Sequence, residues 1–142
     1  MARRTLSLEV RKQLHEAARS VVADKGEVLF RSGQECQGAF LIQSGEVKLS
    51  LDSVSNSYPP RTVSSGFVVG LPASFSGEPY SLTAEAKTMC RLDFISRRKL
   101  LKVLHEHPKT GFEIVRLLSD EIFKMRKAAE KAAVMRTNAN VA

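Results

Sequence analysis

The sequence predicts a mainly β protein, a β-roll of the double-stranded β-helix or jelly-roll type, with flanking helices. Short apolar runs separated by glycines and polar turns indicate strands between residues 21 and 95. A helical pattern precedes this region and a longer one follows it. With 142 residues, 43% of them apolar, the chain can bury a substantial core. We expect one structural domain with a helix at 1–20, the roll at 21–95, and a short helix, a long helix and a tail at 96–142.

The first helix is expected near residues 6–20. Leu6, Val10, Leu14, Ala17 and Ala18 recur at helical spacing, with charged residues between them. This apolar face should pack on the roll.

Glycines mark the turns of the predicted roll. Segment 21–33 indicates two short strands and 38–51 two more, with Ser44-Gly45 typical of a tight hairpin. Gly33 and Gly45 fall where strands reverse and where a positive φ angle favours glycine. Residues 52–60 are polar and end in two prolines, which predicts an exposed loop. Strands are then expected at 61–66 (with a turn), 67–69, 81–86 and 89–95.

The stretch from Gly70 to Lys87 is the candidate binding site. The apolar strand 67–69 runs into Gly70, and Pro72 follows in a short polar segment. Glycine lets a backbone approach a ligand closely, and a proline in the first helical turn leaves the N–H groups after it free to bind an anion. The pattern therefore predicts a site for an anion.

This order of features resembles the phosphate-binding cassette of the cyclic nucleotide-binding domains, in particular those of bacterial Crp/Fnr-type regulators. Segments 26–33 and 40–47 are similar to the glycine-and-strand pattern of their roll. The resemblance implies a sensor domain for a small ligand. It implies these ligand-binding positions: Gly70, Leu71, Pro72, Ala73, Tyr80, Ser81, Leu82 and Thr83.

The ionic contacts of that family are missing here. Leu71 stands where the family has a ribose-binding Glu, and Tyr80 where it has a phosphate-binding Arg. An alignment shifted by two residues sets Leu82-Thr83-Ala84 against the family's Arg-Ser-Ala or Arg-Thr-Ala and also lacks the arginine. A Thr-Ser pair that touches the base in some members corresponds to Ala129-Glu130. Cyclic nucleotides are therefore expected to bind weakly if at all, no cofactor is assigned, and the natural small-molecule ligand stays open.

A short helix is expected to begin after the N-cap Ser96 and to stop before Pro108. His105 and His107 lie at its end, and two residues apart they point to different faces. We interpret them as helix caps rather than metal ligands. Cys36 and Cys90 form no metal-spaced pair, so we expect two reduced, half-buried thiols and no metal site.

The segment 108–135 predicts a long helix with a heptad pattern, followed by a polar tail. Its apolar seam favours a parallel homodimer. The dimer positions are Val115, Leu118, Ile122, Met125 and Ala129. The alternative is an amphipathic helix folded back on its own roll, which would bury Ile114, Leu117 and Phe123.

Charge and motifs restrict the function classes. The net charge of +7 favours a solvated basic surface over a nucleic-acid site, because no aromatic residues are interleaved with the basic ones. The helix-turn-helix of Crp/Fnr-type regulators needs about 60 further residues. These residues alone should therefore bind DNA without sequence selectivity. If selective binding were seen instead, Lys124, Arg126, Lys127 and Lys131 would be the first residues to mutate. The domain is either free-standing or part of a longer regulator, and a DNA or protein partner stays open.

Other classes lack their signatures. No apolar run approaches the roughly 20 residues of a membrane-spanning helix, and no signal peptide is seen, so a cytoplasmic protein with no membrane partner is expected. No P-loop, Gly-x-Ser-x-Gly or His-Glu-x-x-His motif occurs, so no catalytic residues and no enzyme activity are expected. Two hypotheses remain: a ligand-responsive sensor module, or a constitutive dimerisation or scaffold module that has lost its ligand. An open polar pocket would favour the first, and a pocket filled by Leu71 and Tyr80 the second.

Overall fold

The computed structural model describes residues 6–51 and 59–141. Beyond Asp120, the side chains that it describes are those of Phe123, Arg126, Lys127, Glu130, Lys131 and Val134. The elements in chain order are α1 Leu8–Ala17, β1 Arg19–Ala23, β2 Val28–Phe30, β3 Gly38–Ser44, β4 Val47–Ser50, β5 Arg61–Val63, β6 Val68–Val69, α2 Leu71–Ser76, β7 Thr83–Ala86, β8 Cys90–Ser96, α3 Arg97–Glu106 and α4 Pro108–Val141. None of the described helices combines the length and apolar character that crossing a bilayer would require.

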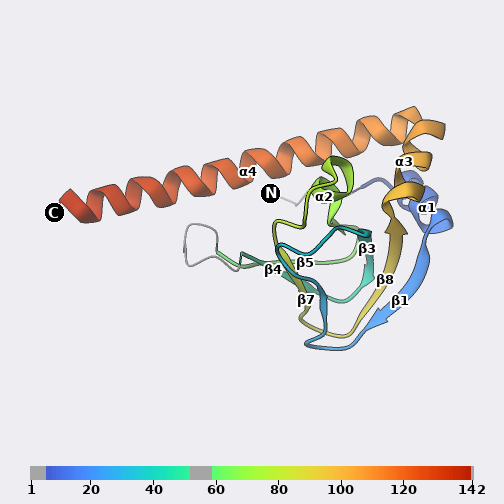
Figure 1. Cartoon of the computed structure of the whole chain (residues 1–142), viewed down its shortest axis with the longest axis horizontal. Coiled ribbons are helices and arrows are strands. Elements are labelled where there is room, and N and C mark those ends of the chain that lie inside the picture. Colours follow the sequence, from blue (N-terminus) through green and yellow to red (C-terminus); the bar gives the residue numbers. More distant parts are fainter. Residues whose placement is uncertain (1–5, 52–58, 142) are drawn as a thin grey trace.

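The described strands form two four-stranded sheets, with strand orders β1-β8-β3-β6 and β2-β7-β4-β5. Every strand pair is antiparallel. The chain passes from one sheet to the other at almost every connection, and only β4 and β5 are consecutive strands that pair. This winding confirms the predicted β-roll with flanking helices (Figure 1).

The tight hairpin predicted at Ser44-Gly45 is wrong. β3 pairs with β6 and β8, whereas β4 pairs with β5 and β7, so Gly45 lies on a crossing between sheets. The reason is burial: Ile42 of β3 and Val47 of β4 belong to the same core, which lies between the two sheets. Gly45 still has the expected positive φ, 96°. A glycine pattern thus indicates a turn without saying which strands it joins.

The sheet β1-β8-β3-β6 is buried on both faces. Along β3, Phe40 and Ile42 face the core between the sheets, while Ala39 and Leu41 face a second core beneath the helices. Successive side chains of a strand point to opposite faces, so an apolar run such as that of β3 requires cover on both. The second core is completed by Leu6, which precedes α1, and by residues from all four helices: Val10, Leu14, Leu71, Leu100, Val103, Ile114 and Leu117.

Helix boundaries differ from the predicted ones at both ends of the chain. Ser7 caps α1 by accepting a hydrogen bond from Val10 N at 3.3 Å, and the helix ends at Ala17. Arg19 and Ser20, expected in the helix, pair with β8 instead. α4 continues to Val141, where a polar tail had been expected after Met135. Local helix propensity predicted the ends of both helices poorly. Pairing with β8 takes Arg19 and Ser20 out of α1, and α4 continues through residues of low helix propensity.

A buried carboxylate ties α1 to the roll. Asp93 of β8 is 2% exposed, and its Oδ2 lies 2.7 Å from His15 Nδ1 and 2.5 Å from Gln43 Nε2. A buried carboxylate is stable only when paired. His15, which had no evident partner in the sequence, therefore anchors the first helix to the sheet.

The crowding at Gly45 gives a stability prediction. A Cβ at Gly45 would lie 2.4 Å from the carbonyl oxygen of Met89 and 2.8 Å from Cys90 Sγ, whereas one at Gly26, which has φ of 89°, would meet nothing within 4 Å. Gly26→Ala should cost only the left-handed backbone penalty, about 1–2 kcal/mol. Gly45→Ala should cost the same plus about 1–3 kcal/mol of overpacking.

Urea denaturation of the two variants and the parent protein measures this difference. Equal losses of unfolding free energy in both variants would contradict the close contacts of a Cβ at Gly45 with Met89 and Cys90.

Candidate functional site

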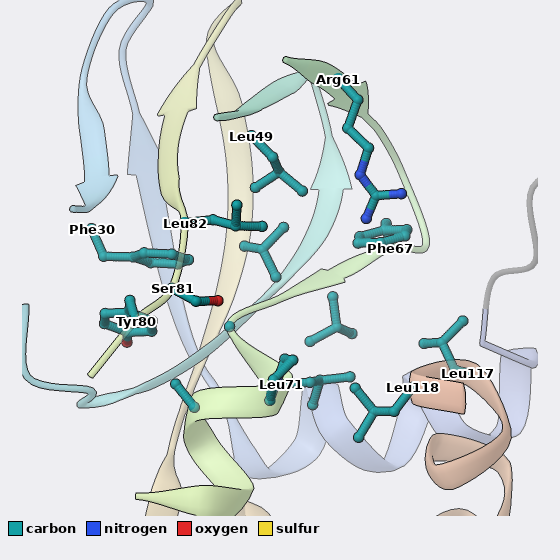
Figure 2. A pocket seen from close by; sticks show the side chains of 15 residues that line it. Phe30, Leu49, Arg61, Phe67, Leu71, Tyr80, Ser81, Leu82, Leu117 and Leu118 are labelled. Atoms are coloured by element: carbon teal, nitrogen blue, oxygen red, sulfur yellow. The ribbon is translucent and has the colours of Figure 1, made fainter. Parts of the chain in front are cut away.

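A cavity opens where the roll meets α4. It lies among the first turn of α2, the loop before β7, strands β4 to β6 and two leucines of α4 (Figure 2). Its volume is about 80 Å³. Ligand pockets usually measure about 300–1,000 Å³, so a bound molecule must be small or must displace part of the wall. The lining residues are Phe30, Leu49, Arg61, Phe67, Val68, Val69, Gly70, Leu71, Pro72, Ala73, Tyr80, Ser81, Leu82, Leu117 and Leu118.

Most of the predicted site residues meet at this cavity. Seven of the eight, from Gly70 to Ala73 and from Tyr80 to Leu82, line it. Thr83 does not: it lies on β7, and its hydroxyl accepts a hydrogen bond from Ser32 N at 2.9 Å. The cassette stretch is therefore a spatial unit, although Gly70 and Leu82 are twelve residues apart in the chain.

Gly70 permits the sharp entry into α2. Its φ is 90°, in the left-handed region, and its carbonyl oxygen accepts hydrogen bonds from Ser74 N at 3.1 Å and Ser74 Oγ at 2.7 Å. A Cβ there would lie 3.1 Å from both the Gly38 carbonyl oxygen and Tyr80 Cε1. Only glycine combines this φ with such close neighbours. The groups that approach Gly70 in the structure belong to the chain itself, and its predicted role beside a ligand stays a prediction.

Leu71 belongs to the core beneath the helices. It is 1% exposed and belongs to the same cluster as Leu41, Val68 and Ile114. An apolar side chain in this place cannot accept the hydrogen bonds of a sugar hydroxyl. The Leu71 side chain therefore offers no polar contact to a molecule in the cavity.

Tyr80 is held firmly in the wall of the cavity. Its ring stacks on Phe30 with centroids 3.8 Å apart and planes 11° apart. Its hydroxyl donates to the Gly38 carbonyl oxygen at 2.6 Å and accepts from the N–H groups of Gln37 and Gly38, each at 3.3 Å. Burial, together with its contact with the Cys36 thiol, raises the pKa of Tyr80 from 10.0 to about 12. The phenol is therefore neutral, fully engaged, and turned away from the cavity.

Arg61 is the functional candidate that sequence reasoning missed. It extends from β5, and its guanidinium lies 5.6 Å from the centroid of the Phe67 ring (Figure 2). Among the described residues that line the cavity, it alone carries a charge. A signal existed: Val63, two residues further along the strand, is fully buried. Because side chains at i and i+2 share one face of a strand, Arg61 had to face inward too.

α4 forms one wall of the cavity. Some of its side chains agree with the predicted dimer seam and others with the predicted helix folded back on the roll. Ile114 and Leu117 are buried on the roll, as the folded-back alternative expected, but Phe123 is 63% exposed. Val115 is 60% exposed, as a dimer seam requires, whereas Leu118 packs partly against the core and lines the cavity. The side chains of Ile122, Met125 and Ala129 lie outside the described residues.

The histidines and cysteines form no further site. His105 lies in the last turn of α3 and His107 is its C-cap, with the His107 N–H bonded to the Val103 carbonyl oxygen at 2.8 Å. Cys36 and Cys90 are free but fully buried rather than half-buried, and burial raises the pKa of the Cys90 thiol. Across the described part of the chain, no group of three or more His, Cys, Asp or Glu side chains could hold a metal ion.

Comparison with known proteins identifies the class. Residues 20–107 match the model of the cyclic nucleotide-binding domain family, and this chain belongs to that family. No match was found among the curated proteins.

Solved structures share the fold at low sequence identity. The catabolite activator protein of Thermus thermophilus aligns with a TM-score of 0.74 and 19% identity, over 92% of this chain and 61% of that one. The c-di-GMP-responsive regulator CLP of Xanthomonas campestris gives 0.74 and 15%, over 90% and 63%. A cyclic nucleotide-binding domain from Methylobacillus flagellatus gives 0.69 and 23%, over 89% and 72%. This chain thus spans less than two thirds of the first two proteins.

The environment of Tyr80 predicts an unusual titration. The chain has two tyrosines and no tryptophan, so Tyr58→Phe leaves Tyr80 as the sole phenol. Ultraviolet absorbance of the phenolate should then give a midpoint near 12 rather than at the ordinary 10.0. A midpoint near 10 in protein that circular dichroism shows to be folded would contradict the burial of the hydroxyl.

The same shift sets the sign of a pH effect on stability. Between pH 10 and 12 the unfolded chain has lost the phenol proton that the folded protein retains. The unfolding free energy contributed by Tyr80 is therefore complete below pH 10 and is lost as pH rises to about 12. Tyr80→Phe should remove this part of the pH dependence in urea titrations.

Proposed function

We propose that this chain is a ligand-responsive sensor domain in which occupation of the cavity is transmitted to α4. The observation that carries the proposal is the shared wall: cassette residues Leu71 and Tyr80 and the α4 residues Leu117 and Leu118 line one cavity. A molecule that enters it must contact both the roll and the helix. α4 extends well beyond the roll (Figure 1), so a small rotation at the cavity would be enlarged at its far end.

The mechanism is a shift of population between two placements of α4. A ligand can move the helix only by the difference of its affinities for the two placements, which is typically about 1–3 kcal/mol. The small cavity favours this view, because a ligand of ordinary size would displace part of the wall, and Leu117 and Leu118 of α4 belong to that wall. Binding and displacement of the helix would then be the same event.

A second candidate function is a constitutive dimerisation or scaffold module. Its support is that Leu71 and Tyr80 are almost completely buried, at 1% and 4% exposure, where a cyclic nucleotide would need polar groups. The remaining cavity favours the sensor, since a roll that had lost its ligand altogether would gain stability by filling the space. Neither function requires catalysis, and we assign no enzyme activity to the chain.

The partner proposed for α4 is a second copy of the chain. Exposed apolar side chains follow the helix outside its contact with the roll: Phe112, Val115, Phe123 and Val134. Single exposed apolar residues are ordinary on a surface, but a line of them along one helix is typical of a protein interface. A DNA or other protein partner would act through this dimer, and the described basic residues Arg126, Lys127 and Lys131 would add only non-specific attraction to phosphates.

Cyclic AMP and cyclic GMP should bind weakly if at all. With Leu71 and Tyr80 in the cassette, the phosphate loses a charge-assisted hydrogen bond worth about 1.5–3 kcal/mol, or roughly ten- to hundredfold in affinity. Titration calorimetry at micromolar protein should show no saturable heat. A dissociation constant in the low micromolar range or tighter would contradict this reading of the cassette.

Dimer formation can be tested with two matched variants. Val115 on α4 and Met89 beside β8 are 60% and 59% exposed, so glutamate at either position should leave the fold intact. Val115→Glu should abolish the dimer, because two unpaired charges buried at the seam cost several kcal/mol. Met89→Glu should have no effect.

Sedimentation equilibrium of the parent protein and both variants measures this. A parent protein that is monomeric at tens of micromolar, or a Val115→Glu dimer as stable as the parent dimer, would exclude the interface on α4.

A further inference from the structure

We infer that the cavity binds a small uncharged apolar molecule, about the size of a single aromatic ring. This inference rests on the proposed sensor function and specifies its ligand class. The three supporting observations are the position of the cavity between two hydrophobic cores, the state of the polar side chains in its wall, and its size.

The cavity lies where the two hydrophobic cores meet. Leu49 and Phe67 of its wall belong to the core between the sheets, whereas Leu71 and Leu117 belong to the core beneath the helices (Figure 2). A hydrocarbon in this space would leave water for apolar surroundings on both sides, which is favourable. A polar group in the same space would lose its hydrogen bonds to water. The two cores therefore select an apolar ligand.

The described wall has three polar side chains, of which two are engaged and one is exposed. Arg61 already has an interaction partner in the structure, and its guanidinium lies 5.6 Å from the centroid of the Phe67 ring. The Tyr80 hydroxyl donates to the Gly38 carbonyl oxygen at 2.6 Å. Ser81 is exposed, so water can satisfy its hydroxyl. A ligand anion would have to compete with the partner of Arg61, whereas an uncharged apolar molecule leaves all these interactions in place.

The size of the cavity restricts the ligand further. An apolar cavity of about 150 Å³ binds benzene. The cavity here measures about 80 Å³, so a single ring fits only if part of the wall moves. Leu82 and Leu118 are the leucines of the described wall that stay partly exposed, and moving them uncovers the least apolar surface. Because Leu118 belongs to α4, entry of a ring would displace the helix that the sensor function requires to move.

The probes are toluene, its anionic counterpart benzoate, and cyclic AMP. Binding to the full chain is followed through the leucine methyl signals in NMR spectra. Leu82→Phe narrows the cavity and Leu82→Ala widens it. The matched controls are Leu29→Phe and Leu29→Ala, because Leu29 is also partly buried against the core between the sheets but does not line the cavity.

Two further measurements accompany the titrations. Circular dichroism and urea denaturation verify that each variant is folded. Hydrogen exchange of the α4 amides, with and without toluene, reports whether the helix responds to the ligand. Should Leu82→Phe fail to fold, Leu82→Ala tests the same wall by an effect of opposite sign.

Toluene should bind the parent protein with a dissociation constant of about 1 mM or lower and shift the methyl signals of Leu71, Leu82 and Leu117. Leu82→Phe should weaken binding roughly tenfold or more, because the new ring occupies the space. Leu82→Ala should strengthen it, since toluene then fits without displacing the wall. Both Leu29 variants should bind like the parent protein. Benzoate should bind at least roughly tenfold more weakly than toluene, because its charge would be buried without a partner. Exchange of the α4 amides should change when toluene is bound.

Several outcomes would overturn the inference, and they are separable from failure of the sensor function. Benzoate binding as tight as that of toluene, or toluene binding that neither Leu82 variant alters, excludes the apolar ligand class at this cavity. A response of α4 to benzoate or cyclic AMP without toluene binding replaces the ligand class and keeps the sensor. If toluene binds at Leu82 but α4 exchange is unchanged, the ligand class stands and the sensor function fails. Binding of none of the probes rejects the apolar ligand and favours the scaffold module.

Discussion

The structure depends on one constraint: the sheet β1-β8-β3-β6 has apolar side chains on both faces and must be covered on both. The second sheet covers one face, and the four helices share the other. Ile114 and Leu117 of α4 are buried there together with Leu14 of α1 and Leu100 of α3, although these helices come from opposite ends of the chain. The placement of α4 thus follows from the need to cover this face of the sheet. The cavity lies where α4 meets the segment from Gly70 to Leu82.

Within this frame the segment from Gly70 to Leu82 is held by contacts inside the protein. The chain has a left-handed turn at Gly70 followed by the short helix α2. Residues 20–107, which include both, match the cyclic nucleotide-binding domain family. Tyr80 is stacked on Phe30 and bonded to Gly38, so its contacts lie inside the protein. These contacts stabilise the loop before β7 without a ligand. The charged residue among the described residues of the cavity wall is Arg61 of β5.

Several relationships in the molecule escaped prediction for the same physical reason. The Ser44-Gly45 turn was predicted to join a hairpin but carries the chain between sheets, and His15 had no apparent partner until β8 brought Asp93 to it. Turn chemistry and residue type are local properties. Pairing of strands and pairing of buried polar groups depend on which distant segments come together.

The sequence by itself determined the β-roll, the order of its helices, the glycine at the entry to α2 and the residue types Leu and Tyr at positions 71 and 80. These follow from local periods, from steric rules for a positive φ, and from residue chemistry that needs no partner. Only the tertiary structure decided that Leu71 is core, that Tyr80 is bonded to Gly38, that Leu118 faces the cavity while Val115 faces outward, and that Arg61 joins the site. Each of these depends on the packing of segments far apart in the chain, and the periodicity of a single segment does not specify which segment covers it.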